Sequence, residues 1–183
     1  MDLFAGIESR TSALKLSAPG PSREHIEQMI HAATRAPDHG RLRPWRFVVL
    51  EGAAIQKLGD EMARMLQAKM PQATPEQLNA ERAKPMRAPT IIAVAAKITK
   101  GKIPDVEQVA AVSAGVQNML LAAHALGYGA MWKTGAAAYD ANVKASLGLS
   151  PDDHQIVAFL YLGTIVTPGS QVSARDEGMT TWL

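Results

Sequence analysis

One loop of the chain gathers side chains that could bind a charged or planar ligand. Residues 35–50 read R-A-P-D-H-G-R-L-R-P-W-R-F-V-V-L, so Arg35 and His39 lie close to a rigid Pro44–Trp45 pair. A guanidinium group binds anions, and an imidazole ring can donate or accept a hydrogen bond. The loop follows a predicted helix and precedes a predicted strand, and loops held in this way often display binding groups. Taken alone, His39 is more typical of a solvated or hydrogen-bonded loop residue.

A second segment with binding chemistry follows a helix predicted over residues 2–9. Arg10, Thr11 and Ser12 place a guanidinium group beside two hydroxyl groups. A charged fork flanked by neutral donors suits a phosphate group. The alternative interpretation is a solvated helix end without a ligand, which the residue types alone favour.

A third segment ends a strand predicted over residues 130–134. Trp132, Lys133 and Thr134 combine an aromatic ring, a cation and a hydroxyl group. Such a set can cover a planar heterocycle and bind its polar edge. Packing at the end of the strand is the alternative explanation.

Regular elements must hold these three segments in place. Apolar spacing predicts helices over residues 2–9, 23–36, 55–66 and 106–126. Apolar runs predict strands over residues 47–50, 90–97 and 156–162. A further strand is predicted over residues 130–134, after the glycines that end the preceding helix. Capping residues at Thr74 and Asp140 predict two further short helices. Helices and strands do not alternate regularly, which favours an α+β sandwich over a doubly wound sheet.

The helix predicted over residues 106–126 has almost no polar face. A helix that is apolar nearly all round must be buried. The sequence leaves open whether its own domain or a partner subunit buries it.

Length and composition predict one globular domain over residues 1–183. The chain is 47% hydrophobic and 20% charged, carries a net charge of +2 and has no cysteine. The small net charge argues against nucleic-acid binding, and the lack of thiols excludes disulfides and cysteine metal sites. The histidine spacing predicts no metal site, and the glycine motifs of dinucleotide folds and P-loops are absent. Because the N-terminus lacks a signal-peptide pattern and no apolar run is long enough to span a membrane, we expect a cytoplasmic protein.

The loop at residues 35–50 resembles the signature of the FMN-dependent nitroreductase family, whose commoner form is A-P-S-S-x-N-x-Q-P-W-x-F. The A-P-D-H variant followed by P-W-R-F is most similar to the short, single-domain subgroup of NAD(P)H nitroreductases. The resemblance covers essentially the whole chain. It implies a central mixed or antiparallel sheet flanked by helices, a long buried core helix and an intertwined homodimer with one FMN at each subunit interface.

The resemblance also implies roles for the three binding segments. The first would contact the ribityl phosphate of FMN, the loop would reach the flavin across the dimer, and the strand end would lie beside the ring. The implied cofactor-binding set is Arg10, Thr11, Ser12, Arg35, His39, Trp132, Lys133 and Thr134. The polar residues 67–87 would form part of the rim above the flavin.

This chain departs from the common family pattern at two positions. Arg41 replaces an Asn and Arg43 replaces a Gln, so neither is included in the predicted cofactor-binding set. Asp38 is expected to fix the loop through a hydrogen bond to its backbone. For Trp45, packing in the core is at least as good an explanation as contact with a ligand.

The activity that the resemblance implies is hydride transfer from NAD(P)H through FMN to a nitroaromatic, a quinone or a similar acceptor, in a ping-pong scheme. The cofactor carries the redox chemistry, so no catalytic acid–base residue is required of the protein. The alternatives are an FMN carrier or sensor with little turnover, and a purely structural oligomer that would be colourless when purified.

Overall fold

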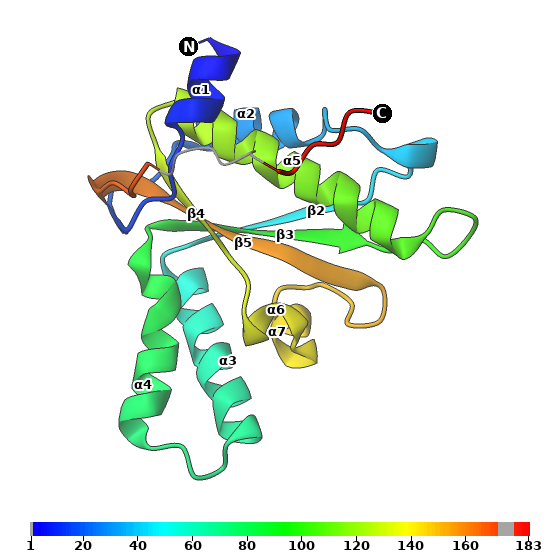
Figure 1. Ribbon diagram of the computed structural model, residues 1–183. Helices are drawn as coiled ribbons and strands as arrows, with labels where there is room; N and C mark the ends of the chain where they lie inside the picture. Colours follow the sequence, from blue (N-terminus) through cyan, green and yellow to red (C-terminus); the bar gives the residue numbers. More distant parts are fainter. Residues whose placement is uncertain (1, 172–177) are drawn as a thin grey trace.

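The computed structural model of the chain describes residues 2–171 and 178–183, and five strands form one sheet with helices on both faces (Figure 1). The strand order is β1–β5–β3–β2, and β4 pairs with β5 beside this path. The four pairings are all antiparallel, so the sheet is antiparallel rather than mixed. The strands are β1 (Lys15–Ser17), β2 (Trp45–Glu51), β3 (Thr90–Lys97), β4 (Gly129–Lys133) and β5 (His154–Thr167).

Helices form a layer on each side of this sheet. Figure 1 shows α2 and α5 along one face, and α3, α6 and α7 against the other, with α4 packed on α3. The α-helices of the described residues are α1 (Leu3–Ser9), α2 (Arg23–Ala33), α3 (Ala53–Lys69), α4 (Pro75–Ala83), α5 (Asp105–Ala125), α6 (Ala136–Tyr139) and α7 (Ala141–Ser146). Two 3₁₀ turns are η1 (His39–Arg41) and η2 (Lys84–Arg87). The predicted α+β class is confirmed.

The central strand β3 contributes side chains to both hydrophobic cores of the molecule. Successive side chains of a strand point to opposite faces of the sheet. Ile91, Ala93 and Ala95 therefore join the cluster beneath α3, while the alternate residues Ile92 and Val94 join the cluster beneath α5. All five are fully buried, which explains why this strand reads as a continuous apolar run.

The sequence left open whether α5 is buried by its own chain or by a partner subunit. Val112, Val116 and Met119 are fully buried against the sheet within the same chain. The opposite side of the helix remains accessible, and Val106 in its first turn is 71% exposed. The chain therefore buries one face of this helix and leaves the other face accessible.

Local capping signals agree with the helix boundaries. The Thr74 hydroxyl accepts the Gln77 backbone N–H while the Gln77 side chain accepts the Thr74 N–H, and this reciprocal pair begins α4. The Asp140 carboxylate accepts the N–H groups of Asn142 and Val143 at the start of α7. The prediction missed β1, whose three residues are too few to give a pattern; it forms because β5 continues to Thr167 and offers an edge for pairing.

None of the helices in residues 2–171 and 178–183 combines the length and the apolar character that a membrane-spanning helix needs.

Candidate functional site

β4 is the frame of the candidate site, because two of the three predicted binding segments lie at its two ends. Among the described residues, only β5 forms a ladder with this strand. The other edge of β4 carries no second strand among the described residues, and the backbone groups that Ala13 leaves unpaired there can bind a ligand.

The segment of Arg10, Thr11 and Ser12 lies at the start of β4. Arg10 is the C-cap of α1, and its backbone N–H donates to a carbonyl of that helix at 3.1 Å. The N–H of Ala13 then donates to the carbonyl of Ala130 at 3.1 Å, which fixes the segment beside the first half of the strand. The side chains of Arg10 and Thr11 are half-buried and that of Ser12 is exposed. One guanidinium and two hydroxyl groups are thus held at one end of β4.

Trp132, Lys133 and Thr134 lie at the other end of the strand. The indole N–H of Trp132 donates to the carbonyl of Val157 at 3.0 Å, which anchors the ring, and the residue is 37% exposed. Lys133 and Thr134 are exposed. From Ala130 to Thr134, four extended residues span roughly 13 Å. The two ends of β4 can therefore contact the two ends of one elongated ligand.

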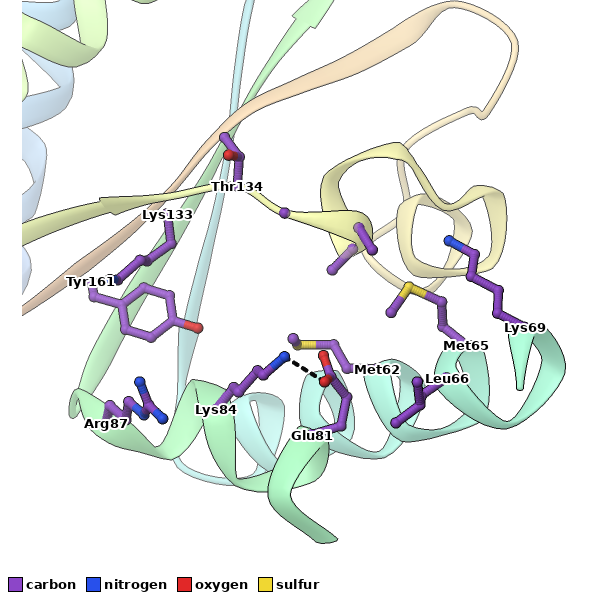
Figure 2. Close-up of a pocket in the computed structure, with 13 residues that line it drawn as sticks. Met62, Met65, Leu66, Lys69, Glu81, Lys84, Arg87, Lys133, Thr134 and Tyr161 are labelled. Carbon is purple, nitrogen blue, oxygen red and sulfur yellow. Dashed lines mark hydrogen bonds and ion pairs between the residues drawn. The ribbon is translucent and has the colours of Figure 1, made fainter. Parts of the chain in front are cut away.

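The end of β4 borders a pocket on each face of the sheet. On the side of α5, a pocket of about 370 Å³ includes Trp132, Thr134 and the exposed Tyr139. On the side of α3, a pocket of about 330 Å³ includes Lys133 and Thr134 together with side chains from α3, α4 and η2 (Figure 2). Thr134 is therefore shared by the two spaces.

Arg35 lies away from β4 within one chain. It is exposed at the end of α2 and lines a groove of about 400 Å³ between α1, α2 and α5. Leu3 of α1 and Leu121 of α5 also line this groove, which is largely apolar. Arg35 belongs to neither of the pockets that border the end of β4.

His39 lies four residues further along the loop from Arg35, beside the first turn of α5. Its Nδ1 atom is 2.5 Å from a carboxylate oxygen of Glu107, in the first turn of α5. His39 lines neither the groove of Arg35 nor either of the pockets that border the end of β4. One chain therefore does not bring Arg35, His39 and the end of β4 into a single cavity.

The rest of the signature loop has a structural role. A carboxylate oxygen of Asp38 accepts the backbone N–H of Arg43 at 2.7 Å, so Asp38 fixes the loop as predicted, across five residues rather than the two of an Asx turn. Arg41 and Arg43 have φ values of 53° and 51° and point into solvent. Trp45 is 8% exposed and donates its indole N–H to the Ala111 carbonyl at 3.3 Å, which confirms that it packs in the core.

Comparison with known proteins identifies the family. The model of the Nitroreductase family matches residues 7–164, which include β4 and both of its ends. The chain belongs to the nitroreductase family. It is therefore an oxidoreductase, and the resemblance read from the loop at residues 35–50 is confirmed.

This nitroreductase is 35% identical over 167 residues to YdjA of Escherichia coli strain K12, which is named as a candidate NAD(P)H nitroreductase; the match covers 90% of this chain and 88% of YdjA. A nitroreductase-like protein from Bacillus cereus has a TM-score of 0.82 at 22% identity, covering 100% of this chain and 96% of that one, and shows the fold alone. A nitroreductase from Desulfovibrio desulfuricans, solved in complex with FMN, has a TM-score of 0.76 at 25% identity and covers 98% of this chain and 95% of that one.

The sequence pattern missed several residues that the nitroreductase fold places beside Lys133. Lys84 and Arg87 of η2 and Tyr161 of β5 line the same pocket. Burial raises the pKa of Tyr161 to about 12, although the neighbouring Arg87 guanidinium acts to lower it. The signals in the sequence were weak: two cations in a polar stretch and one tyrosine in an otherwise aliphatic strand.

Proposed function

We propose that this nitroreductase binds FMN along the free edge of β4 and uses it to pass a hydride from NAD(P)H to a nitroaromatic, a quinone or a similar acceptor. The observation that carries the proposal is the placing of a phosphate-binding segment and an aromatic, cationic segment at the two ends of one open strand. The FMN complex of the Desulfovibrio desulfuricans relative supports the choice of cofactor.

The residues at both ends of β4 suit the chemistry of FMN. Arg10 can form a charge-assisted pair with the phosphate, and the hydroxyl groups of Thr11 and Ser12 can donate further hydrogen bonds. At the other end, the exposed face of Trp132 offers a surface for a planar ring, and Lys133 offers a charge for its polar edge. Backbone N–H groups on the open edge can bond the polar atoms between these ends.

Bound FMN would supply the redox chemistry, accepting a hydride from NAD(P)H and giving it to the second substrate after the first product leaves. The side chains of the chain then have three tasks: they bind the cofactor, orient it and leave one face open to both substrates. None of these tasks requires an acid–base residue, so the cofactor-binding residues alone can sustain this activity.

A homodimer would complete the site. The outer surface of α1 is apolar, with Leu3 at 64%, Phe4 at 72% and Ile7 at 48% exposure. These residues adjoin the apolar groove against α5 that Arg35 lines. Contiguous exposed apolar surface of this kind is typical of a protein–protein interface. Across such an interface, Arg35 and His39 of one subunit can reach the cofactor of the other, which one chain alone does not allow.

The contact between His39 and Glu107 determines which ring nitrogen of His39 is available to a ligand. With Nδ1 held by the Glu107 carboxylate, the other ring nitrogen, Nε2, is the atom left to face the flavin. A positive group near the flavin favours its reduced state, which gives Arg35 a role in tuning the cofactor, while His39 would contact the ring through Nε2.

The first experiment measures FMN affinity after replacement of Arg10. Loss of one charge-assisted contact, about 1.5–3 kcal/mol, should weaken FMN binding of Arg10→Ala about 10- to 100-fold. Arg64→Ala removes an exposed guanidinium from α3 and should leave the affinity unchanged. Titration of the apoprotein with FMN, followed by quenching of flavin fluorescence, gives both values. Equal affinities for Arg10→Ala and the parent chain would overturn the assignment.

A second measurement separates an enzyme from an FMN carrier or sensor. Steady-state oxidation of NADPH or NADH by the FMN-loaded protein, with and without a nitroaromatic acceptor, reports turnover directly. Acceptor-dependent oxidation supports the proposed enzyme. Bound FMN without turnover would instead support an FMN carrier or sensor.

A further inference from the structure

The pocket between β4 and the α3–α4 hairpin has an apolar floor and a cationic rim (Figure 2). Met62, Met65 and Leu66 of α3 face Ala136 and Ala137 of α6 across the floor. The rim carries four cations and one acid: Lys69, Lys84, Arg87 and Lys133 against Glu81. A pocket of this composition favours a ligand that has an apolar body and a negative charge.

Two of the rim cations are already neutralised in part. The ammonium group of Lys84 pairs with the Glu81 carboxylate, and that of Lys69 lies 3.9 Å from an Asp140 oxygen. For Arg87 and Lys133, no carboxylate of the described residues lies within 4.0 Å. Lys133 comes from the end of β4, and Arg87 comes from η2 (Figure 2).

Tyr161 places a polar atom within the same space. The residue is only 5% exposed, yet its hydroxyl group makes no hydrogen bond to the described part of the chain. Figure 2 shows the hydroxyl directed into the pocket, between the side chains of Lys84 and Arg87 on one side and Lys133 on the other. Burial raises the pKa of this phenol to about 12, so the hydroxyl remains protonated and can donate a hydrogen bond.

We propose that this pocket selects aromatic carboxylates as the preferred electron acceptors, with Arg87 and Tyr161 binding the carboxylate and the α3 side chains covering the ring. The inference rests on the proposed function. An acceptor in this pocket would lie beside FMN because Lys133 and Thr134 border both the pocket and the proposed FMN site.

The geometry gives each group a separate task. The planar guanidinium of Arg87 can form two parallel bonds to a carboxylate. The Tyr161 hydroxyl can donate to the same group without adding charge. A volume of about 330 Å³ is near the lower limit of small-molecule sites, so a single substituted ring suits it better than a polycyclic quinone.

The test compares two acceptors that differ in one charge, 4-nitrobenzoate and 4-nitrobenzamide. In the FMN-loaded parent protein, kcat/KM should be higher for the benzoate. Arg87→Gln should lower the benzoate-to-benzamide ratio about 10-fold or more, as expected for a lost charged hydrogen bond, while Arg87→Lys should restore part of it. Tyr161→Phe should lower the ratio several-fold. Lys57→Gln, which removes an exposed cation of α3 outside the pocket, should leave the ratio unchanged.

A binding measurement keeps this inference separate from the proposed function. Benzoate should bind to the FMN-loaded protein in calorimetric titration, and Arg87→Gln should weaken that binding by a similar factor. Turnover of both nitro compounds with equal efficiency and no benzoate binding would overturn the carboxylate site while leaving the flavin enzyme intact. An altered NADPH-to-NADH preference or a loss of FMN in Arg87→Gln, with benzoate binding unchanged, would likewise overturn it. Absent FMN binding in the parent protein would instead refute the proposed function.

Discussion

The packing of the α3–α4 hairpin, which forms one wall of the pocket that Arg87 and Tyr161 line, depends on a single glycine. Gly59 of α3 is buried against α4, and a Cβ atom at this position would lie 2.3 Å from the Arg82 carbonyl oxygen. It would also lie 3.3 Å from the terminal methyl carbon of Met86. The Met86 side chain can move aside, but a backbone carbonyl within a helix cannot. Gly59→Ala should therefore displace α4 from α3.

The size of the effect follows from two opposing contributions. An ordinary contact needs roughly 3.4 Å, so the two helices must separate locally by about 1 Å. Such overpacking costs about 1–3 kcal/mol, and a rigid backbone neighbour favours the upper part of that range. Alanine is the better helix former by roughly 0.5–1 kcal/mol. The expected net result is destabilisation by about 1–2 kcal/mol, or a fall in Tm of roughly 2–8 °C for a chain of this size.

Urea unfolding of the FMN-free protein, followed by circular dichroism, measures this change without the added stability of bound cofactor. Gly101→Ala is the matched control: Gly101 is exposed, and a Cβ atom there meets nothing within 4 Å. Its free energy of unfolding should change by less than about 0.5 kcal/mol. A Gly59→Ala variant that is as stable as the parent, or more stable, would show that the hairpin is not packed through Gly59. In that case the close contact between Gly59 and Arg82 would not hold this wall of the pocket in place.

Two further predictions concern the interface and the buried phenol. Leu121→Asp places a charge in the apolar groove and should give a monomer in sedimentation velocity, with weakened FMN binding. Val116→Asp places a charge in the core of the chain and should unfold it. An FMN-loaded monomer of the parent protein would refute the interface. Because the pKa of Tyr161 is raised to about 12 in the folded chain, the unfolded chain releases this proton first, and stability should fall as the pH rises from 10 to 12. Between pH 9 and pH 11, Tyr161→Phe should remove about 1.3 kcal/mol of that alkaline loss, measured by urea unfolding at the two pH values. Tyr139→Phe, at a 77% exposed position, should remove almost none.

Local patterns determined the elements and the segments that carry binding groups. The capping pair at Thr74 and Gln77, the cap at Asp140 and the apolar run of β3 each act over a few residues, so their signals are visible in the sequence. The loop at residues 35–50 also revealed the family, because its residue order is specific.

The sequence by itself thus determined the α+β class, the helices and longer strands, and the three segments with ligand-binding chemistry. Only the tertiary structure decided which of these segments meet. The antiparallel ladder places Tyr161 of β5 next to Met131 of β4, and the packing of α4 and η2 brings Arg87 to the same pocket from more than 70 residues away. The structure also showed that α5 buries only one face within the chain and that Arg35 and His39 lie outside the pockets at the end of β4. Contacts of this kind depend on strand register and helix packing, which arise from the summed burial of many side chains and leave no short pattern in the sequence.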